Sequence, residues 1–255
     1  MNRVARISVS PVKGFRLSHP DEVRLGPHGV EDNRRFFLVD ADGQRLRSSE
    51  TPWPTTIRVD YRADAEVLRM QFPDGTEVAA SAVAKGERVH STSGTIEVTG
   101  RIVEGPWEAP LARLAGAPVR LARADRTGAG MNAPVTLVSD GSLARLAQEA
   151  GRSEVDARRF RMLFELHGCD AHEEDTWDGL AFEIGSAVVR VGGPVDRCAV
   201  TTRDPETGTR DLDTLRLLKE YRGQRESDGA VLFGVYASVE RPGVVRVGDA
   251  FARVA

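Results

Sequence analysis

One of the two cysteines in the sequence stands in a setting that favours chemistry. Cys198 directly follows Arg197 and lies five positions before Arg203, within the stretch VGGPVDRCAVTTRDPETGTRD. A neighbouring cation stabilises the thiolate, which is the form of cysteine that attacks substrates and binds metals. A lone cysteine in an apolar stretch such as Cys-Ala-Val is, however, often a small buried side chain. The local sequence alone therefore favours a packed core residue over a nucleophile or a metal ligand.

Basic side chains also stand at the ends of several predicted strands, far apart in the sequence. The guanidinium group matches the geometry of a phosphate, and a lysine supplies a point charge. If the strands close into a barrel, these cations would converge on one anionic ligand, although each one alone is more typical of a solvated face or an ion pair. They are Lys13, Arg34, Arg35, Arg158, Arg159 and Arg161. Neither GxxxxGK[ST] nor GxGxxG after a strand occurs, so ATP and NAD sites are not indicated.

A third group of reactive side chains falls in the stretch LHGCDAHEEDTWDG, residues 166–179. From His167 to Asp175 it combines imidazole, thiol and carboxylate groups, which could bind zinc or iron. The spacing matches no zinc pattern, and runs of charged residues are usually solvated. The preferred interpretation is an exposed acidic loop, in which Glu174 or Asp175 could pair with one of the arginines.

Composition restricts the class of protein. The chain has 255 residues, 40% of them hydrophobic and 29% charged, and a formal net charge of −3. This charge does not favour a nucleic-acid partner, because such proteins usually carry a basic excess. No apolar stretch is long enough for a membrane span, and the first residues lack the apolar core of a secretory signal. The two cysteines form no disulfide framework, so we expect a cytoplasmic protein.

The hydrophobic pattern of the first half predicts short strands. Turn signals recur roughly every ten residues, which is typical of a β-barrel or sandwich. Asp-Gly pairs predict turns at residues 40–43 and 73–75, and TIEVTGRIVEG predicts a strand pair. In the second half, Gly185-Ser186 predicts a hairpin.

Two helices are predicted in the second half. SDGSLARLAQEAG begins with Ser139 or Asp140 as a cap and ends at Gly151. DLDTLRLLKEYRG has leucines at helical spacing and ends at Gly223. The Pro-, Gly- and Ala-rich stretch at residues 105–122 is the best candidate for a domain boundary.

Several long stretches resemble a known family. GGPVDRCAVTTRDPETGTRDLDTLRLLKEYR and the later FGVYASVERPGVVRVGD closely resemble the C-terminal segment of MOSC-domain proteins, named for the molybdenum cofactor sulfurase C-terminal domain. ISVSPVKGFRL and VRLGPHGVEDNRRFFLVDADGQRLRS resemble the β-barrel domain that precedes MOSC in the mitochondrial amidoxime reducing component and its bacterial relatives. The resemblance covers nearly the whole chain. It implies an α+β, mainly β fold, with an N-terminal β-barrel-like domain (1–110) packed on a β-rich MOSC barrel (111–255) with a few helices.

The resemblance also implies a cofactor site. In molybdenum-binding members the cysteine of the Arg-Cys string is a thiolate ligand of molybdenum, which would make Cys198 the metal ligand and the catalytic residue. Lys13 stands where the family's lysine approaches the phosphate of the pterin, and the second arginine of Arg-Phe-Arg, here Arg161, lies beside the cofactor. The implied cofactor-binding residues are Lys13, Gly14, Arg35, Thr136, Ser139, Arg159, Arg161, Arg197 and Thr201.

The chain departs from the family pattern at three places. Reductase members usually continue Arg-Phe-Arg with Pro-Asn, whereas Met162-Leu163 follows here. The family's Ala-Arg-Gln after the first hairpin is replaced by Arg47-Ser48-Ser49. The string HEEDTW is not part of the reductase pattern. These differences indicate a divergent branch.

The expected function is that of a molybdenum-cofactor oxidoreductase, with Mo-molybdopterin as cofactor, that reduces N-hydroxylated or related small substrates. No flavin, haem or iron–sulfur motif is present, so we expect a separate electron-transfer protein as partner. One alternative is molybdenum-independent sulfur transfer or carbon–sulfur cleavage, with Cys198 as nucleophile or persulfide carrier. In that case pyridoxal phosphate is expected only on a separate sulfur-donor protein. The other alternative is a non-catalytic module that binds a pterin or another anion.

Overall fold

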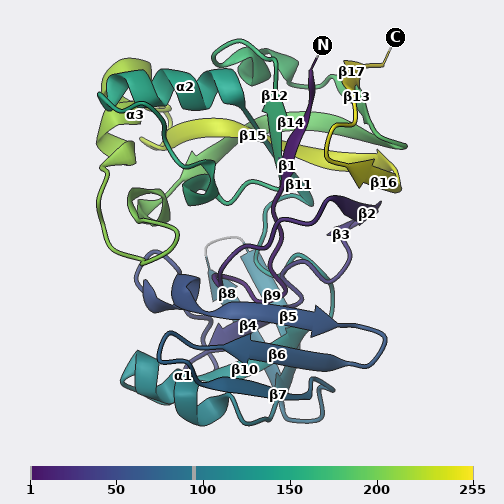
Figure 1. The fold of residues 1–255 in the computed structure, drawn as a ribbon, viewed down its shortest axis with the longest axis vertical. Helices are drawn as coiled ribbons and strands as arrows, with labels where there is room; N and C mark the ends of the chain where they lie inside the picture. Colours follow the sequence, from purple (N-terminus) through teal and green to yellow (C-terminus); the bar gives the residue numbers. More distant parts are fainter. Residues whose placement is uncertain (1, 94–95, 255) are drawn as a thin grey trace.

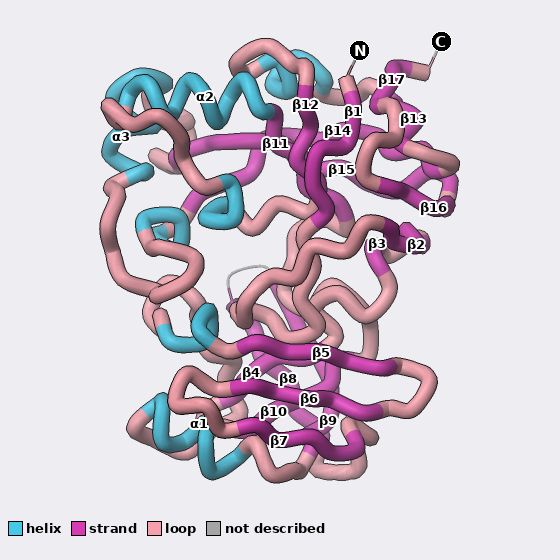
Figure 2. The backbone as a smooth tube through the Cα atoms, in the orientation of Figure 1, coloured by secondary structure: helices cyan, strands magenta, loops and turns pink. Residues whose placement is uncertain are grey.

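The computed structural model describes residues 2–93 and 96–254. It contains two bodies stacked along the long axis of the molecule, an upper body and a lower body in Figure 1. Strands make up 39% of the structure. This content confirms the predicted α+β, mainly β class. Figure 2 shows that the region between the two bodies consists largely of loops.

The upper body is built on a seven-stranded sheet that is nearly closed into a barrel. Its strands, in spatial order, are β1 (Arg3–Ile7), β12 (Phe164–His167), β11 (Val135–Ser139), β15 (Val231–Arg241), β14 (Ala187–Arg197), β13 (Ala181–Ile184) and β17 (Phe251–Arg253). A bridge between Arg3 and Ala250 links the two edges. All five residues of β11 are buried, because this strand is central in the sheet and covered on both faces.

Two α-helices and a small sheet complete the upper body. Helix α2 (Asp140–Glu149) is capped by Ser139, whose side chain accepts a hydrogen bond from the backbone of Ser142. Helix α3 (Thr214–Arg222) is capped in the same way by Asp213. The small sheet has the order β16 (Gly243–Arg246), β2 (Glu22–Gly26), β3 (Gly29–Val30).

The lower body consists of two smaller sheets and helix α1 (Glu108–Ala115). One sheet has the order β4 (Phe36–Val39), β10 (Arg120–Ala124), β9 (Ile96–Val103), β8 (Arg88–Ser93), and the other has the order β5 (Arg58–Arg62), β6 (Val67–Gln71), β7 (Glu77–Ser81). The two sheets and α1 enclose a core of aliphatic and aromatic side chains around Trp107 and Phe36. Burial of such side chains is the main stabilising term for a body of this size.

Each body contains strands that precede the expected domain boundary at residues 110 and 111 in the sequence and strands that follow it. Strand β1 pairs with β12, and β2 pairs with β16, although β1 and β2 lie at the start of the chain. In the other direction, β10 completes the lower sheet by pairing with β4 and β9. The boundary at 110/111 stays a prediction of domain organisation.

Most predicted elements are present, with two differences. Both predicted helices and the Gly185-Ser186 hairpin are confirmed, since that hairpin joins β13 and β14. The strand pair predicted for TIEVTGRIVEG is wrong: Ile96–Val103 is one strand, and Thr95 lies outside the described residues. The region at 105–122 contains helix α1, which the sequence analysis did not predict.

Four short 3-10 helices lie in the described connections: η1 (Trp53–Thr56), η2 (Ala157–Phe160), η3 (Glu173–Trp177) and η4 (Ala199–Thr202). Helices η2 and η4 contact each other beneath the large sheet. They carry the Arg-Phe-Arg and Arg-Cys strings, so the loop region between the bodies brings these strings together.

Candidate anion and cofactor site

Cys198 lies at the junction between β14 and η4 and is exposed to solvent. The backbone carbonyl of Cys198 accepts a hydrogen bond from the hydroxyl of Thr201, at 3.1 Å. Thr201 is itself buried and bonded to Thr214 at 2.7 Å, which anchors η4 to α3. The preferred local interpretation of Cys198 as a buried core residue is therefore wrong. It applies instead to Cys169, which is buried.

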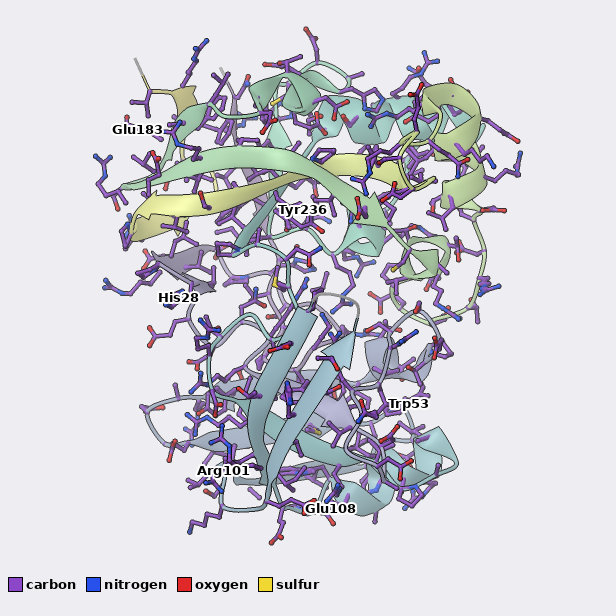
Figure 3. The ribbon with its side chains drawn as sticks, turned by 180° about the vertical axis from the view of Figure 1, so that it is seen from behind. His28, Trp53, Arg101, Glu108, Glu183 and Tyr236 are labelled. Carbon is purple, nitrogen blue, oxygen red and sulfur yellow. The ribbon has the colours of Figure 1, made fainter. Side chains whose placement is uncertain are left out.

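A cavity of about 480 Å³ opens beside Cys198 in the loop region between the two bodies. It brings together residues from Lys13 to Tyr236, which lie far apart in the sequence, as expected for strand ends that converge. Eight of the residues implied by the family resemblance line it: Lys13, Gly14, Thr136, Arg159, Arg161, Arg197, Cys198 and Thr201. Figure 3 shows the molecule from behind, with Tyr236, another cavity residue, in the upper body and Trp53 in the lower body.

Two implied residues do not line the cavity. Ser139 caps α2, and its hydroxyl donates to the buried carboxylate of Glu174 at 2.6 Å. Arg35 donates to the backbone carbonyl of Asp125 at 3.1 Å, while its neighbour Arg34 lines the cavity instead. Arg34 has a positive φ of 53°, which bends the chain so that the two arginines diverge.

Lys13 is a cavity cation whose pKa is strongly lowered. Its ammonium group donates to the carbonyl of Gly130 at 2.7 Å. Burial lowers the pKa of Lys13 well below its usual value of 10.5, and the nearby charges of Arg34, Arg45 and Arg161 lower it further. The thiolate of Cys198 acts in the opposite direction and raises the pKa of Lys13. The ammonium group and the thiol are therefore close enough to interact electrostatically.

Arg34 and Arg161 form the centre of this cationic group. Arg161 donates from Nη2 to the carbonyl of Phe15 at 2.6 Å. Burial lowers the pKa of Arg161 to about 9, with a further contribution from Arg34, and burial lowers the pKa of Arg34 to about 10. Within residues 2–93 and 96–254, no carboxylate oxygen lies within 4 Å of the charged groups of Lys13, Arg34, Arg45 or Arg161. Buried cations without an acidic partner create a field that favours an anionic ligand.

Two other cavity arginines are held by the protein itself. Arg197 donates to the carbonyls of Phe233 and Phe160, and its guanidinium group stacks over the Phe160 ring at 5.3 Å. Arg159 forms a two-pronged ion pair with Asp211. These contacts fix η2 against η4 and β15, so both arginines shape the cavity wall.

Two of the three departures from the family pattern also lie in the cavity wall. The thioether of Met162 accepts a hydrogen bond from Nη2 of Arg197 at 2.7 Å. The stretch Arg47-Ser48-Ser49 lines the opposite side, where Arg47 pairs with Glu50 at 3.6 Å. Sequence reasoning did not find Arg45, Asn132 or Tyr236. Arg45 follows a turn and Asn132 lies in a loop, so neither had a periodic pattern to mark it.

The third departure, HEEDTW, forms η3 and lies against the N-terminal end of α2. Among residues 2–93 and 96–254, no group of three or more His, Cys, Asp or Glu side chains is arranged to hold a metal. Glu174 and Trp177 are buried, and Glu174 accepts from the backbone and hydroxyl of Ser139. Asp175 pairs with Arg222 at 2.5 Å. The expectation of an exposed acidic loop is therefore only partly correct, because Glu174 and Trp177 pack against α2 and the core.

Comparison with known families accounts for most of the chain. The MOSC domain family matches residues 124–252, and the MOSC N-terminal beta barrel domain family matches residues 1–104. The chain belongs to the MOSC family. The predicted resemblance is thereby confirmed for both parts of the molecule.

Several curated MOSC relatives are similar to part of this chain. Human mitochondrial amidoxime reducing component 2 is 40% identical over 130 residues, which cover 48% of this chain and 37% of that protein. Human mitochondrial amidoxime-reducing component 1 is 37% identical over 122 residues, which cover 46% of this chain and 35% of that protein. The molybdenum cofactor sulfurase of Drosophila erecta is 23% identical over 252 residues, which cover 92% of this chain and 31% of the sulfurase. The match thus spans 31–37% of each relative's length.

A solved structure similar to the whole chain is the YUAD protein from Bacillus subtilis. It has a TM-score of 0.43 and 12% sequence identity, covering 98% of this chain and 94% of that one. In the described part of the MOSC chain, no helix is both long and apolar enough to cross a membrane.

Proposed function

We propose that the cavity binds the molybdenum cofactor and that the protein reduces N-hydroxylated or related small molecules. The observation that supports this most is the cationic cavity beside Cys198. Four cations without a carboxylate partner face the same space as an exposed thiol. A phosphate-bearing ligand with a soft metal would satisfy both features, because guanidinium groups bind phosphate and thiolates bind soft metals.

The residues present fit this ligand in charge, because buried cations line the cavity beside an exposed thiol. Gly14 has a φ of +90°, and a Cβ there would lie 3.1 Å from the hydroxyl of Ser48. Lys13, Arg34 and Arg161 would hold the phosphate, and Cys198 would coordinate the metal. When bound, the cofactor would supply two-electron reduction with removal of an oxygen atom from the substrate.

The protein's own groups orient and stabilise the ligand in this proposal. Lys13 and Arg161 neutralise anionic charge in a site shielded from water, where such contacts are stronger than in bulk solvent. Arg197 fixes the strand end that carries Cys198 by donating to Phe233 and Phe160. A separate redox protein would deliver the electrons, because the chain carries no flavin, haem or iron–sulfur motif.

The test is the metal content of protein made in a host that synthesises the cofactor. We expect close to one molybdenum and one pterin per chain in the wild type. Cys198→Ser should lose the metal, whereas Cys169→Ala, the matched control at the buried cysteine, should keep it. Stoichiometric zinc, or no metal together with no pterin fluorescence, would rule the proposal out.

A second candidate function is sulfur transfer, which is favoured by the exposure of Cys198. The Cys198 thiolate would attack the terminal sulfur of a donor protein's persulfide, take that sulfur and release the donor's thiolate. Pyridoxal phosphate, if required, would belong to the donor. Persulfide-specific labelling that disappears in Cys198→Ser would support this function. Pterin binding that survives the same substitution unchanged would instead support a non-catalytic binding module.

A further inference from the structure

Arg45 is a cavity residue to which the expected site assigns no role. It follows the turn after β4, and its backbone amide donates to the buried hydroxyl of Ser91 at 2.9 Å. A bridge to Val39 fixes the same segment to the lower sheet. The backbone of Arg45 is therefore anchored in the lower body while its side chain lines the cavity.

The guanidinium group of Arg45 has no protein partner among the described residues. Its Nε atom is buried and makes no hydrogen bond, and no carboxylate oxygen lies within 4 Å of the group. Arg47, two positions further on, lines the same cavity but pairs with Glu50. A buried donor without an acceptor costs free energy, so its presence calls for a ligand that satisfies it.

Arg45 and Lys13 lie against the same glycine. The carbonyl of Gly130 accepts from Lys13, and a Cβ at Gly130 would overlap the Nη1 atom of Arg45 and lie 3.1 Å from Nζ of Lys13. Gly130 has a φ of +67°, which favours glycine in its own right. The two cations are therefore held close together, Lys13 from the loop after β1 and Arg45 from the segment that follows the turn after β4.

We propose that Arg45 and Lys13 form a clamp for one phosphate group of the ligand, with Arg45 as a phosphate-binding residue. The cofactor as source of that phosphate rests on the proposed function, whereas the clamp itself requires only a phosphate. The two cations approach from different segments of the chain, so a phosphate between them would accept hydrogen bonds on two sides. It would also offset the repulsion between the two cations, which lowers the pKa of Lys13.

The first experiment uses inorganic phosphate as the probe, with protein made in a host that lacks the cofactor. Calorimetry and the phosphate-dependent rise in melting temperature would be measured for the wild type, Arg45→Met, Arg45→Lys and Arg69→Met. We expect Arg45→Met to weaken phosphate binding by about tenfold or more, and Arg45→Lys to restore part of the lost affinity. Arg69→Met, the control outside the cavity, removes an exposed arginine of β6 that pairs with Glu77, and it should stay within about twofold of the wild type.

Folding of the variant is tested by the same measurements. Without phosphate, Arg45→Met should melt at the wild-type temperature or higher, because the substitution removes a cation from a repulsive cluster. Phosphate affinity equal to that of the wild type would overturn the proposal. So would a lowered melting temperature without phosphate, since it would show that Arg45 stabilises the fold rather than a ligand.

A second experiment separates this proposal from the proposed function. The same variants would be made in a host that synthesises the cofactor, and their pterin and molybdenum contents compared. If wild-type protein from this second host carries no molybdenum or pterin, while its phosphate binding still depends on Arg45, the clamp would be supported and the cofactor assignment contradicted. Full molybdenum content in Arg45→Met, with unchanged phosphate affinity, would overturn the clamp and leave the cofactor assignment intact.

Discussion

Arg34 donates a hydrogen bond from Nη2 to the backbone carbonyl of Arg161 at 3.1 Å, across 127 positions of sequence. Both residues have positive φ angles, 53° and 52°, which few residues other than glycine adopt. The hydrogen bond therefore holds the Arg34 side chain against the backbone of Arg161 at the cavity. It couples the loop before β4 to the turn after η2, so the two bodies share one cationic wall.

The first prediction contrasts Arg34 with Arg35. Arg34→Met should weaken phosphate binding by about tenfold, because a charge-assisted contact in the cavity is lost. Arg35→Met should have little effect, since Arg35 reaches the carbonyl of Asp125 outside the cavity. Calorimetric titration of both variants checks this. An equal loss of phosphate affinity in both variants would show that Arg35 also belongs to the site.

The second prediction concerns pH and Lys13. The folded state lowers the pKa of Lys13 below its usual value of 10.5, mainly through burial. Between the lowered pKa and 10.5 the unfolded chain binds more protons than the folded one, so the ligand-free protein gains stability as pH rises through that window. In Lys13→Met the free energy of unfolding should no longer rise with pH in this window. Denaturant unfolding from about pH 7 to about pH 10 would measure the difference.

Phosphate binding should change with pH in the opposite sense. As Lys13 loses its proton, the cavity loses one positive charge, so the affinity should fall with rising pH. In Lys13→Met the affinity should be low and less dependent on pH. An unchanged pH profile in this variant would assign the titration to another group.

The third prediction concerns thiol reactivity. Cys198 is exposed, whereas burial and nearby carboxylates raise the pKa of Cys169 to about 12. Because the thiolate is the reactive form, an alkylating reagent near neutral pH should label one thiol per native chain. Mass spectrometry should find that label on Cys198, and denaturation should expose the second site. Fast labelling of Cys169 in the folded protein would contradict the structure.

The fourth prediction compares Gly130 with Gly128, which have similar positive φ angles of 67° and 75°. Alanine at Gly128 meets only the carbonyl of His28, at 3.7 Å, so its cost should be backbone strain of about 1 kcal/mol. Alanine at Gly130 would also displace the Arg45 guanidinium group. It should therefore weaken phosphate binding, whereas Gly128→Ala should not. Equal phosphate affinities in the two variants would argue against the contact.

The fifth prediction concerns Glu174, whose carboxylate is buried and bonded to Ser139. Glu174→Ala should lower the free energy of unfolding by about 1–3 kcal/mol, because it leaves the buried Ser139 donors without their acceptor. Asp178→Ala, at an exposed position after η3, is the control and should stay within about 0.5 kcal/mol. Urea denaturation checks both. A stable Glu174→Ala protein would show that solvent can replace the carboxylate.

Local signals in the sequence predicted the second half of the fold well. Ser139 caps α2 because its side chain can accept a backbone hydrogen bond, and this requirement is visible in the sequence. The stretch TIEVTGRIVEG, predicted as a strand pair, forms one strand that contains Gly100. Its absence of a side chain allows β9 to approach the backbone of Arg123 on β10, and it makes no turn. Local sequence does not show whether a glycine allows a close approach between two backbones or forms a turn.

Helix α1 and the arginines of the cavity show what tertiary structure adds. Pro110 lies in the first turn of α1, where its missing amide proton is not needed, so proline does not exclude a helix there. The choice between Arg34 and Arg35 depends on one backbone angle that no sequence pattern reveals. Arg45 enters the cavity only because β4 and the following turn are held by Ser91, which comes much later in the chain.

The position of β15 has a consequence for the order in which the large sheet and the cavity wall are completed during synthesis. This strand, residues 231–241, lies between β11 and β14 in the middle of the large sheet, although it is made after both. Until the ribosome has released it, the sheet exists as two separate fragments and Arg197 lacks its acceptor on Phe233. Pairings between distant segments form late in folding. The wall of the cavity is therefore completed only after nearly the entire MOSC segment has been translated.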